Sequence, residues 1–287
     1  MAEDPFIGSE ALAAGRLTPH ALRTRFRAVY PDVYVRRDVE WNARRRAMAA
    51  WLWTRRDGIV AGQSAAALHK AKWVDAARPA EVLWPNRRPP PGVHTWSDRV
   101  AGDEIQMIDG MRVTTAARTA LDLACRYPVG RAVAAIDALA RATRLKIPDV
   151  DLLAERYKGR RGLRQACTVL GLVDPGAESP RETWLRLLVI RAGYPPPTTQ
   201  IPVHDRWGTL VAVVDMGWEH LKVGLDYEGA HHGEPSRYKP DIRRYDALTD
   251  LGWIDIRVTS EDTEARILDR LQRAWASASS RALASSG

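Results

Sequence analysis

Long apolar runs are missing from this sequence. No stretch of its 287 residues approaches the roughly 18 consecutive apolar residues of a membrane-spanning helix, so we expect neither such a helix nor a membrane partner. The opening residues, MAEDPFIGSE, also lack the basic and then apolar pattern of a secretory signal peptide. Together these absences predict a cytoplasmic protein.

Cysteine is scarce as well. The chain has 2 cysteines, Cys125 and Cys167, and both stand in helix-like apolar patterns. Such a pair favours buried thiols over a disulfide framework or a cysteine metal site. The apolar fraction of 45% and the 11 tryptophans supply enough apolar surface for a folded core, which excludes a disordered chain.

The net charge of +8 is distributed unevenly along the chain. Residues 1–100 hold 17 Lys and Arg against 10 Asp and Glu, whereas residues 178–287 hold 14 against 16. The basic front favours contact with a polyanion. High arginine usage throughout the genome is the alternative explanation.

Residues 5–37 have the order of a winged helix-turn-helix. We expect Ser9 to cap a short helix that ends at Gly15, and Thr18 to cap a second helix over Pro19–Phe26. Two strand-like runs follow in FRAVYPDVYVRR. In this architecture the second helix enters the major groove, and most of its contacts reach the DNA backbone. The predicted DNA-binding residues here are His20, Arg23, Arg25 and Arg27. A small α/β subdomain with solvated arginines is the alternative.

The rest of the chain divides at GLVDPGAESP, where glycine and prolines coincide with the change in charge balance. Before it, a strand leads into a helix capped by Ser64, and Thr114-Thr115 caps another helix. We therefore predict a multi-domain α/β protein. Its expected parts are a winged-helix domain (1–55), a mixed α+β middle domain (56–175) and an α/β domain (176–287).

A predicted β-hairpin in the last third of the chain carries three carboxylates. Alternating valines predict strands over Leu210–Gly217 and Lys222–Glu228. With a turn at WEHL, Asp215 lies opposite Gly224 and diagonal to Asp226. Carboxylates this close repel unless a cation neutralises them, and hard oxygen ligands suit Mg²⁺ or Mn²⁺. Carboxylates on a solvated strand face are the alternative.

Helices and one more strand surround this hairpin. Ser179 and Glu182 form a capping-box pattern that opens a helix to about Ala192, and this pattern by itself explains Glu182. After the hairpin we expect a helix, a strand and a closing helix, over 241–251, 253–258 and 261–277. This order predicts a compact domain with a mixed sheet.

The motifs SPRE, VVD, LDYEGAHH, YKPDIRR and LGWIDIRVT occur in the order found in a nuclease family. Over residues 177–275 the chain resembles the very-short-patch-repair-like (Vsr-like) branch of the PD-(D/E)XK nuclease superfamily, which implies a restriction-endonuclease-like fold. The resemblance implies that Glu182, Asp215 and Asp226 bind Mg²⁺ or Mn²⁺. It also puts Glu228 where many members have a lysine, and His232 at a motif histidine that can act as a general base. We expect Arg244 to contact phosphate.

The front of the chain resembles a second family. GSEALAAGRLTPHALRTRFRAVYPDVYV is similar to the winged-helix start of abortive-infection (AbiEi-like) antitoxins, and AGQSAAALHK and GMRVTTAARTALDLA are similar to the middle domain that follows it. This resemblance implies binding to double-stranded DNA and a cognate toxin as a protein partner.

Three functions follow from these observations, of which the third is a scaffold that binds a partner protein, such as a cognate toxin, through the middle domain. The first is a metal-dependent DNA endonuclease delivered by a winged helix. The second is an antitoxin-like repressor with an inactive nuclease fold. The second is favoured by a departure from the family pattern: relatives carry Glu-x-Asp-Gly, whereas this chain has Asp226-Tyr227-Glu228-Gly229 and no lysine two residues after Asp226. The exchange of Glu and Asp shifts both carboxylates, and a magnesium site is impaired by such a shift because its coordination geometry is strict.

Overall fold

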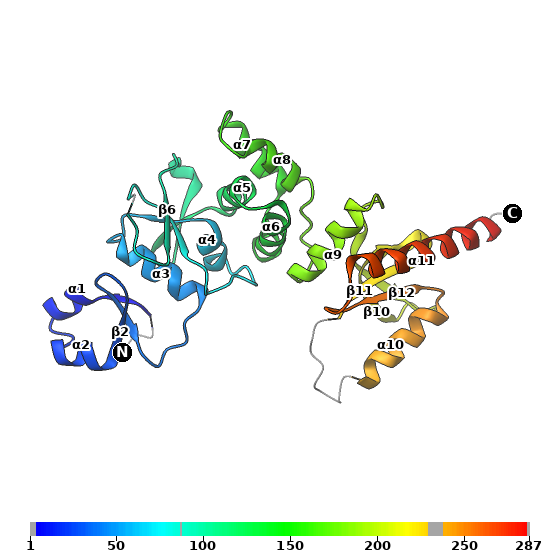
Figure 1. Cartoon of the computed structure of the whole chain (residues 1–287), viewed down its shortest axis with the longest axis horizontal. Coiled ribbons are helices and arrows are strands. Elements are labelled where there is room, and N and C mark those ends of the chain that lie inside the picture. The colour runs from blue at the N-terminus through cyan, green and yellow to red at the C-terminus, as the bar shows by residue number, and fades with distance from the viewer. Residues whose placement is uncertain (1–3, 87, 229–237, 286–287) are drawn as a thin grey trace. The chain divides into compact units, whose positions relative to one another are not determined.

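The computed structural model describes residues 4–86, 88–228 and 238–285, and over 238–243 and 282–285 it describes the helix alone. The chain forms two compact units, Met1–Pro175 and Gly176–Gly287, shown in Figure 1. Each unit is a mixed α/β structure, as the sequence predicts at this coarse level. No helix within the described residues combines the length and the apolarity needed to cross a membrane.

The first unit begins with two short helices and a three-stranded antiparallel sheet of order β1-β3-β2. The elements are β1 (Phe6–Ile7), α1 (Gly8–Ala13), α2 (Pro19–Arg25), β2 (Phe26–Tyr30) and β3 (Val33–Arg36). Thr18 caps α2 as predicted, since its Oγ1 accepts a hydrogen bond from the Ala21 amide at 3.1 Å and Pro19 follows at the first helical position. Phe26 starts β2 instead of ending the helix.

The start of α1 differs from the prediction that Ser9 caps it. Ile7 is the residue before the helix, and it makes no side-chain cap. The cap comes from Asp32, whose carboxylate accepts hydrogen bonds from the Ser9 amide at 2.9 Å and the Ser9 hydroxyl at 2.6 Å. The prediction was wrong because the acceptor lies 23 residues away, in the β2–β3 turn.

The remainder of the first unit is a five-stranded sheet of order β6-β5-β4-β8-β7 with helices. Its elements are α3 (Ala43–Trp53), β4 (Ile59–Val60), α4 (Gly62–Leu68), β5 (Ala80–Leu83), β6 (Val93–Trp96), β7 (Ile105–Ile108), β8 (Met111–Thr114), α5 (Ala116–Arg126), α6 (Val129–Thr143), α7 (Ile147–Glu155) and α8 (Leu163–Leu170). One core cluster joins Tyr30 and Val33 to Val60 and Val113, so packing is continuous across the predicted boundary at residue 55.

Helix α4 is capped from outside its own segment. Ser64 was predicted to be its cap, but the Ser64 hydroxyl accepts the Glu81 amide at 2.9 Å. The Glu81 carboxylate accepts the Gln63 amide at 2.6 Å. The predicted cap of α5 is present, because Thr115 Oγ1 accepts the Arg118 amide at 3.3 Å.

A buried ion network ties α5 to the segments around it. The Arg118 side chain is fully buried, and its Nε lies 3.0 Å from the Asp122 carboxylate. Its Nη1 donates to Glu104 at 2.5 Å and to the Tyr157 hydroxyl at 2.8 Å. Buried charges persist in a core when they are paired in this way, so the network is structural.

The cysteines are both free; Cys125 is half-buried, and Cys167 is exposed where a buried thiol was predicted.

The second unit is a four-stranded mixed sheet of order β12-β11-β10-β9 with three helices in the described residues. Its elements are α9 (Pro180–Arg191), β9 (Thr198–His204), β10 (Leu210–Trp218), β11 (Val223–Tyr227), α10 (Tyr238–Asp250), β12 (Ile254–Val258) and α11 (Glu264–Ser285). Strands β9, β10 and β11 are antiparallel neighbours, and β12 runs parallel to β11.

Two apolar clusters hold this sheet between its helices. Met216, Leu225 and Ile256 pack with residues of α9 and α11. Val214 and Trp253 pack with Leu248 of α10 in a second cluster. The predicted mixed-sheet domain is therefore present, with its helices divided between the two clusters.

Candidate functional site

Asp215 of β10 and Asp226 of β11 lie side by side in the second unit. The Asp215 amide donates to Asp226 Oδ1 at 2.7 Å, and the Tyr227 amide donates to Asp215 Oδ2 at 2.8 Å. Each carboxylate thus accepts a hydrogen bond from the backbone of the neighbouring strand, which fixes both side chains.

The register of this hairpin differs from the predicted one. Gly224 pairs with Gly217, not with Asp215, and Trp218, which was expected in the turn, pairs with Val223. The turn begins one residue later than predicted and ends at Lys222, which adopts a left-handed conformation with φ 52°. The later turn moves the register by two residues, and Asp215 therefore comes directly against Asp226.

Burial and neighbouring negative charges change the protonation of Asp215. Burial, together with the charges of Asp226 and Glu182, raises the pKa of Asp215 to about 7, against the lowering effects of the Tyr227 amide and Arg244. The influence of Glu182 means that α9 brings a third carboxylate to the same region. The three predicted metal ligands thus stand on elements that pack together, α9, β10 and β11.

Glu182 has a structural role as well. The Ser179 hydroxyl accepts the Glu182 amide at 3.2 Å, which is the serine half of the predicted capping box. The other half differs, because Glu182 Oε2 accepts the Glu178 amide at 2.8 Å and not that of Ser179. Only 8% of the residue is exposed. The side chain thus closes the start of α9 while it lies near Asp215.

Two arginines accompany these carboxylates. Arg244 of α10 forms an ion pair with Asp226 Oδ2 and donates to the carbonyl oxygen of Val213 at 2.7 Å. Arg257 of β12 pairs with Glu228 at 3.1 Å. The predicted phosphate-contact residue Arg244 is therefore engaged with the acidic site itself. His232 lies outside the described residues.

Asp255 of β12 is a member of this region that the sequence analysis missed. Its side chain is 2% exposed, and neither carboxylate oxygen has a hydrogen-bond partner among the residues that the structure describes. Arg257 Nε is 3.9 Å away. Burial, together with the charge of Asp226, raises the pKa of Asp255 to about 6. The sequence signal that could have identified Asp255 is an acidic residue inside the apolar strand IDIRV. That Asp255 lies opposite Gly224 is known only from the register of the sheet.

The carboxylates suit a divalent cation in charge and in donor type. Buried like charges are stabilised by a cation, and carboxylate oxygens are the ligands that Mg²⁺ and Mn²⁺ prefer. The ligands are not assembled for coordination, however, because no three His, Cys, Asp or Glu side chains in the described part of the chain form a metal-binding group. Arg244 supplies the positive charge beside Asp226 in this arrangement.

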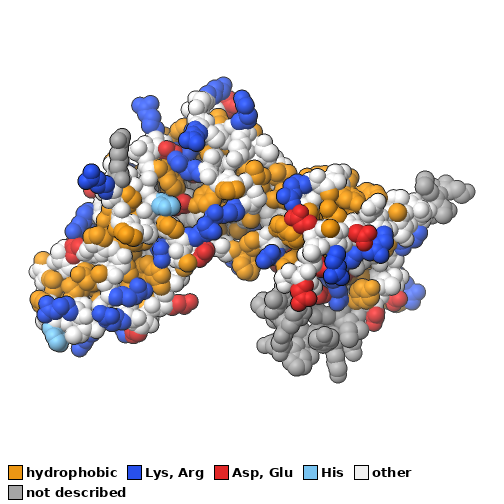
Figure 2. Space-filling view, viewed as in Figure 1, with side chains coloured by type: hydrophobic (Ala, Val, Ile, Leu, Met, Phe, Trp, Pro, Cys, Tyr) orange, Lys and Arg blue, Asp and Glu red, His pale blue; other side chains and the backbone are white. Residues whose placement is uncertain are grey.

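The second candidate region is the basic end of the first unit, where Figure 2 shows Lys and Arg side chains gathered around α2. His20, Arg23 and Arg25 are exposed on α2. Arg27 is not on this helix: it lies in β2, and its guanidinium stacks on Trp41 at 5.1 Å from the ring centroid. Three of the four predicted residues therefore share one exposed helix.

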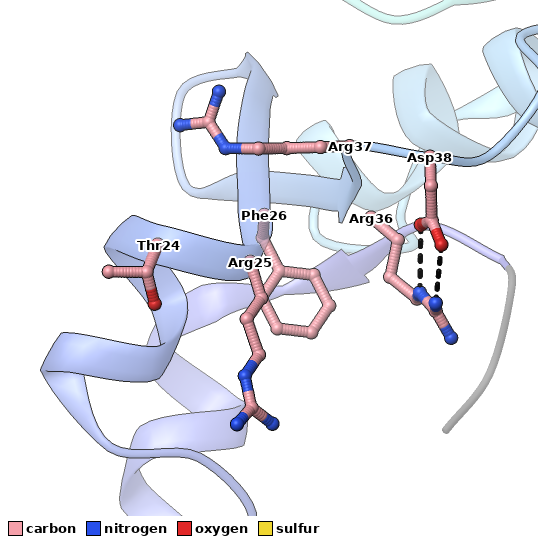
Figure 3. Close-up of a pocket in the computed structure, with 6 residues that line it drawn as sticks. All are labelled: Thr24, Arg25, Phe26, Arg36, Arg37 and Asp38. Atoms are coloured by element: carbon pink, nitrogen blue, oxygen red, sulfur yellow. Dashed lines mark hydrogen bonds and ion pairs between the residues drawn. The ribbon is translucent and has the colours of Figure 1, made fainter.

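A surface cleft of about 440 Å³ lies between the end of α2 and the end of β3. It is lined by Thr24, Arg25, Phe26, Arg36, Arg37 and Asp38. Figure 3 shows Arg25 extending away from the strands, while Arg36 pairs with Asp38 through two hydrogen bonds. Arg37 donates to the Arg23 carbonyl oxygen at 3.3 Å. The sequence analysis missed Arg36 and Arg37, although the pair ends the predicted strand-like run.

Comparisons with known proteins give two relatives. No family model and no solved structure matches the chain. Uncharacterized protein Rv2248 of Mycobacterium tuberculosis strain H37Rv and Uncharacterized protein MT2308 of strain CDC 1551 are each 30% identical to it over 201 residues. The match covers 67% of this chain and 74% of each relative. The chain therefore belongs to the same family as these two mycobacterial proteins.

Proposed function

We propose that this is a DNA-binding protein whose second unit hydrolyses phosphodiester bonds with the help of a divalent cation. The observation that carries the proposal is the buried contact between Asp215 and Asp226, with Glu182 near enough to raise the pKa of Asp215. Negative charges gathered out of water are unfavourable by themselves, and perturbed carboxylates of this kind cluster at functional sites.

The arrangement of the second unit supports a restriction-endonuclease-like fold. A helix precedes three antiparallel strands, and a second helix leads to a strand parallel to the third. The two aspartates stand on the middle pair of strands, and Glu182 stands on the preceding helix. These are the motif positions that the Vsr-like resemblance assigns to metal ligands.

The chemistry that we assign to these residues is binding and orientation. Glu182, Asp215 and Asp226 would hold Mg²⁺ or Mn²⁺, which polarises a phosphoryl oxygen and lowers the pKa of water. Arg244 and Arg257 carry the positive charge that a phosphate needs, and both are already held by hydrogen bonds or ion pairs. Charged hydrogen bonds from guanidinium groups to phosphate are strong and directional.

DNA binding by the first unit is the other half of the proposal. The helix α2 follows a short helix and precedes a β-hairpin, and its exposed face carries His20, Arg23 and Arg25. This order supports a winged helix with α2 as the recognition helix. The basic cleft beside it adds Arg37 as a residue able to contact the DNA backbone.

A second candidate function is a repressor with an inactive nuclease fold. The ion pair of Arg244 with Asp226 favours it, because the guanidinium occupies an oxygen that a metal ligand has to offer. Glu228 at the expected lysine position, paired with Arg257, favours it as well. In this case the AbiEi-like resemblance leads us to propose double-stranded operator DNA and a cognate toxin as partners.

A cleavage assay separates the two functions. Supercoiled plasmid and single-stranded DNA are incubated with Mg²⁺, Mn²⁺ or EDTA and with wild type, the Asp215→Asn/Asp226→Asn double variant, or the exposed control Asp246→Asn. Nicking that requires metal, survives in the control and disappears in the double variant supports the nuclease. Duplex binding without cleavage under any condition overturns it in favour of the repressor.

A further inference from the structure

The turn that joins β9 to β10 presents a tryptophan to solvent. Trp207 is 74% exposed, more than any other large apolar side chain among the described residues. Leu210, which starts β10 three residues after Trp207, is 54% exposed. Because burying a large aromatic is strongly favourable, an exposed one at a loop tip is a candidate for contact with another molecule.

The backbone beneath Trp207 is fixed by its own turn. Asp205 Oδ1 accepts hydrogen bonds from the Trp207 amide at 2.8 Å and the Thr209 amide at 2.9 Å. The turn is closed by backbone hydrogen bonds between Asp205 and Thr209 at 2.9 Å and from Gly208 to Asp205 at 3.0 Å. Gly208 has a φ of +80°, which this tight turn requires. The indole is therefore presented from a rigid base at little further cost in backbone entropy.

A cation accompanies the ring. The Arg206 guanidinium lies 4.1 Å from the centroid of the Trp207 ring, a close cation–π contact. An aromatic face next to an arginine is the combination that binds single-stranded nucleic acid, because a base stacks on the ring while the cation attracts the phosphates. The cation makes a polyanion a better occupant than an apolar protein surface or the acyl chains of a lipid.

The strand that starts at this turn leads to the acidic site. Asp215 is five residues after Leu210 on β10, which corresponds to roughly 17 Å along an extended strand. At the stacked duplex rise of about 3.4 Å per nucleotide this distance spans at most about five nucleotides, and an extended unpaired strand needs fewer. A nucleic acid strand that reaches Asp215 is thus long enough to reach the turn.

We infer that Trp207 and Arg206 form a stacking site for an unpaired nucleobase, a few nucleotides from the phosphate at the acidic site. The inference rests on the proposed function for the identity of the partner as nucleic acid. It adds a preference for single-stranded or locally opened substrate, which the acidic site alone does not give.

Binding measured by fluorescence anisotropy tests this inference. The full chain is titrated, in EDTA so that no cleavage intervenes, into a labelled 20-nucleotide single strand and into the duplex of the same sequence. Trp207→Ala is expected to weaken single-strand binding roughly 5- to 140-fold, the range of one lost base–aromatic stack. Duplex binding is expected to stay within about 2-fold, since paired bases offer no free face to the ring. Trp207→Phe, which keeps an aromatic face, is expected to retain most of the affinity.

The matched control is Trp73→Ala, because Trp73 is 63% exposed in the first unit and lies outside the proposed site. Unchanged single-strand affinity in Trp207→Ala, or an equal loss in the Trp73→Ala control, overturns the stacking site. An equal loss of affinity for duplex and single strand in Trp207→Ala overturns the stacking site too. A change in the oligomeric state of this variant, measured by light scattering, also overturns it and identifies a protein interface instead. Absence of cleavage with Trp207-dependent binding would contradict the nuclease proposal alone.

Discussion

The acidic site gives a prediction about stability that runs against its role in function. Replacing Asp215 by Asn keeps the shape of the side chain and an oxygen for the Tyr227 amide, but it removes one of the charges gathered with Asp226 and Glu182. We expect Asp215→Asn to stabilise the second unit at pH 8 and to abolish any metal-dependent activity.

The magnitude follows from the pKa of Asp215. Burial and its acidic neighbours raise that pKa from 3.8 to about 7. One pKa unit corresponds to about 1.36 kcal/mol, so ionising the folded site costs about 4 kcal/mol above pH 7. A neutral amide accepts the Tyr227 hydrogen bond less strongly than a carboxylate, which offsets about 1 kcal/mol. The expected net gain for Asp215→Asn is therefore about 2–4 kcal/mol at pH 8.

The sign of the pH dependence follows from the raised pKa. The folded state keeps its proton up to about pH 7, whereas the unfolded state loses it near pH 3.8. The favourable contribution of the protonated group is complete below pH 3.8 and is lost as pH rises through 7. At pH 5 most of the cost is absent, so the gain of Asp215→Asn is expected to shrink by about 2–3 kcal/mol relative to pH 8.

Urea denaturation of the full chain at pH 8 and pH 5 measures this gain, with the exposed substitution Asp246→Asn as control. A destabilised or unchanged Asp215→Asn variant at pH 8 would refute the reasoning. So would a gain of the same size at both pH values, because the effect would then not depend on the charge of residue 215.

Three further predictions concern other parts of the molecule. Mg²⁺ or Mn²⁺ should stabilise wild type and so raise its unfolding temperature, but not that of Asp215→Asn/Asp226→Asn. The expected stabilisation is about 2.7 kcal/mol at a metal concentration of 100 times the dissociation constant. Equal shifts of the unfolding temperature in both proteins would exclude this site. Asp122→Ala should cost about 3–5 kcal/mol in urea denaturation, since it removes the buried carboxylate that lies 3.0 Å from Arg118 Nε; a loss under about 1 kcal/mol would contradict the network's structural role. Arg25→Ala should weaken duplex binding similarly for all sequences and reduce the salt slope by about 1, and an unchanged slope would remove Arg25 from the interface.

Local sequence signals predicted much of the secondary structure. Thr18-Pro19 begins α2, Thr115 caps α5 and Ser179 begins α9, because a cap bonds an amide only three residues away. The β2–β3 hairpin breaks at Pro31-Asp32 as expected. These features depend on short stretches of chain. The residues that produce them are close together in the sequence, so a local pattern is enough to predict them.

Caps supplied from a distance could not be predicted. Asp32 bonds the start of α1, and Glu81 bonds the start of α4, although both helices have a nearby serine that was the expected cap. The side chains of Ser9 and Ser64 make other hydrogen bonds instead. Which acceptor reaches a helix start depends on how strands pack beside it, and a local pattern does not contain that information.

The sequence by itself determined that Glu182, Asp215 and Asp226 are the acidic residues to examine, because each stands in a motif or on an alternating strand. Only the tertiary structure decided how they meet. A left-handed Lys222 set the register that brings Asp215 against Asp226. The parallel pairing of β12 with β11 then brought Asp255 to the same region, and helix α10 brought Arg244. Charges act through space over a few ångströms, so their sum depends on contacts between segments far apart in the chain.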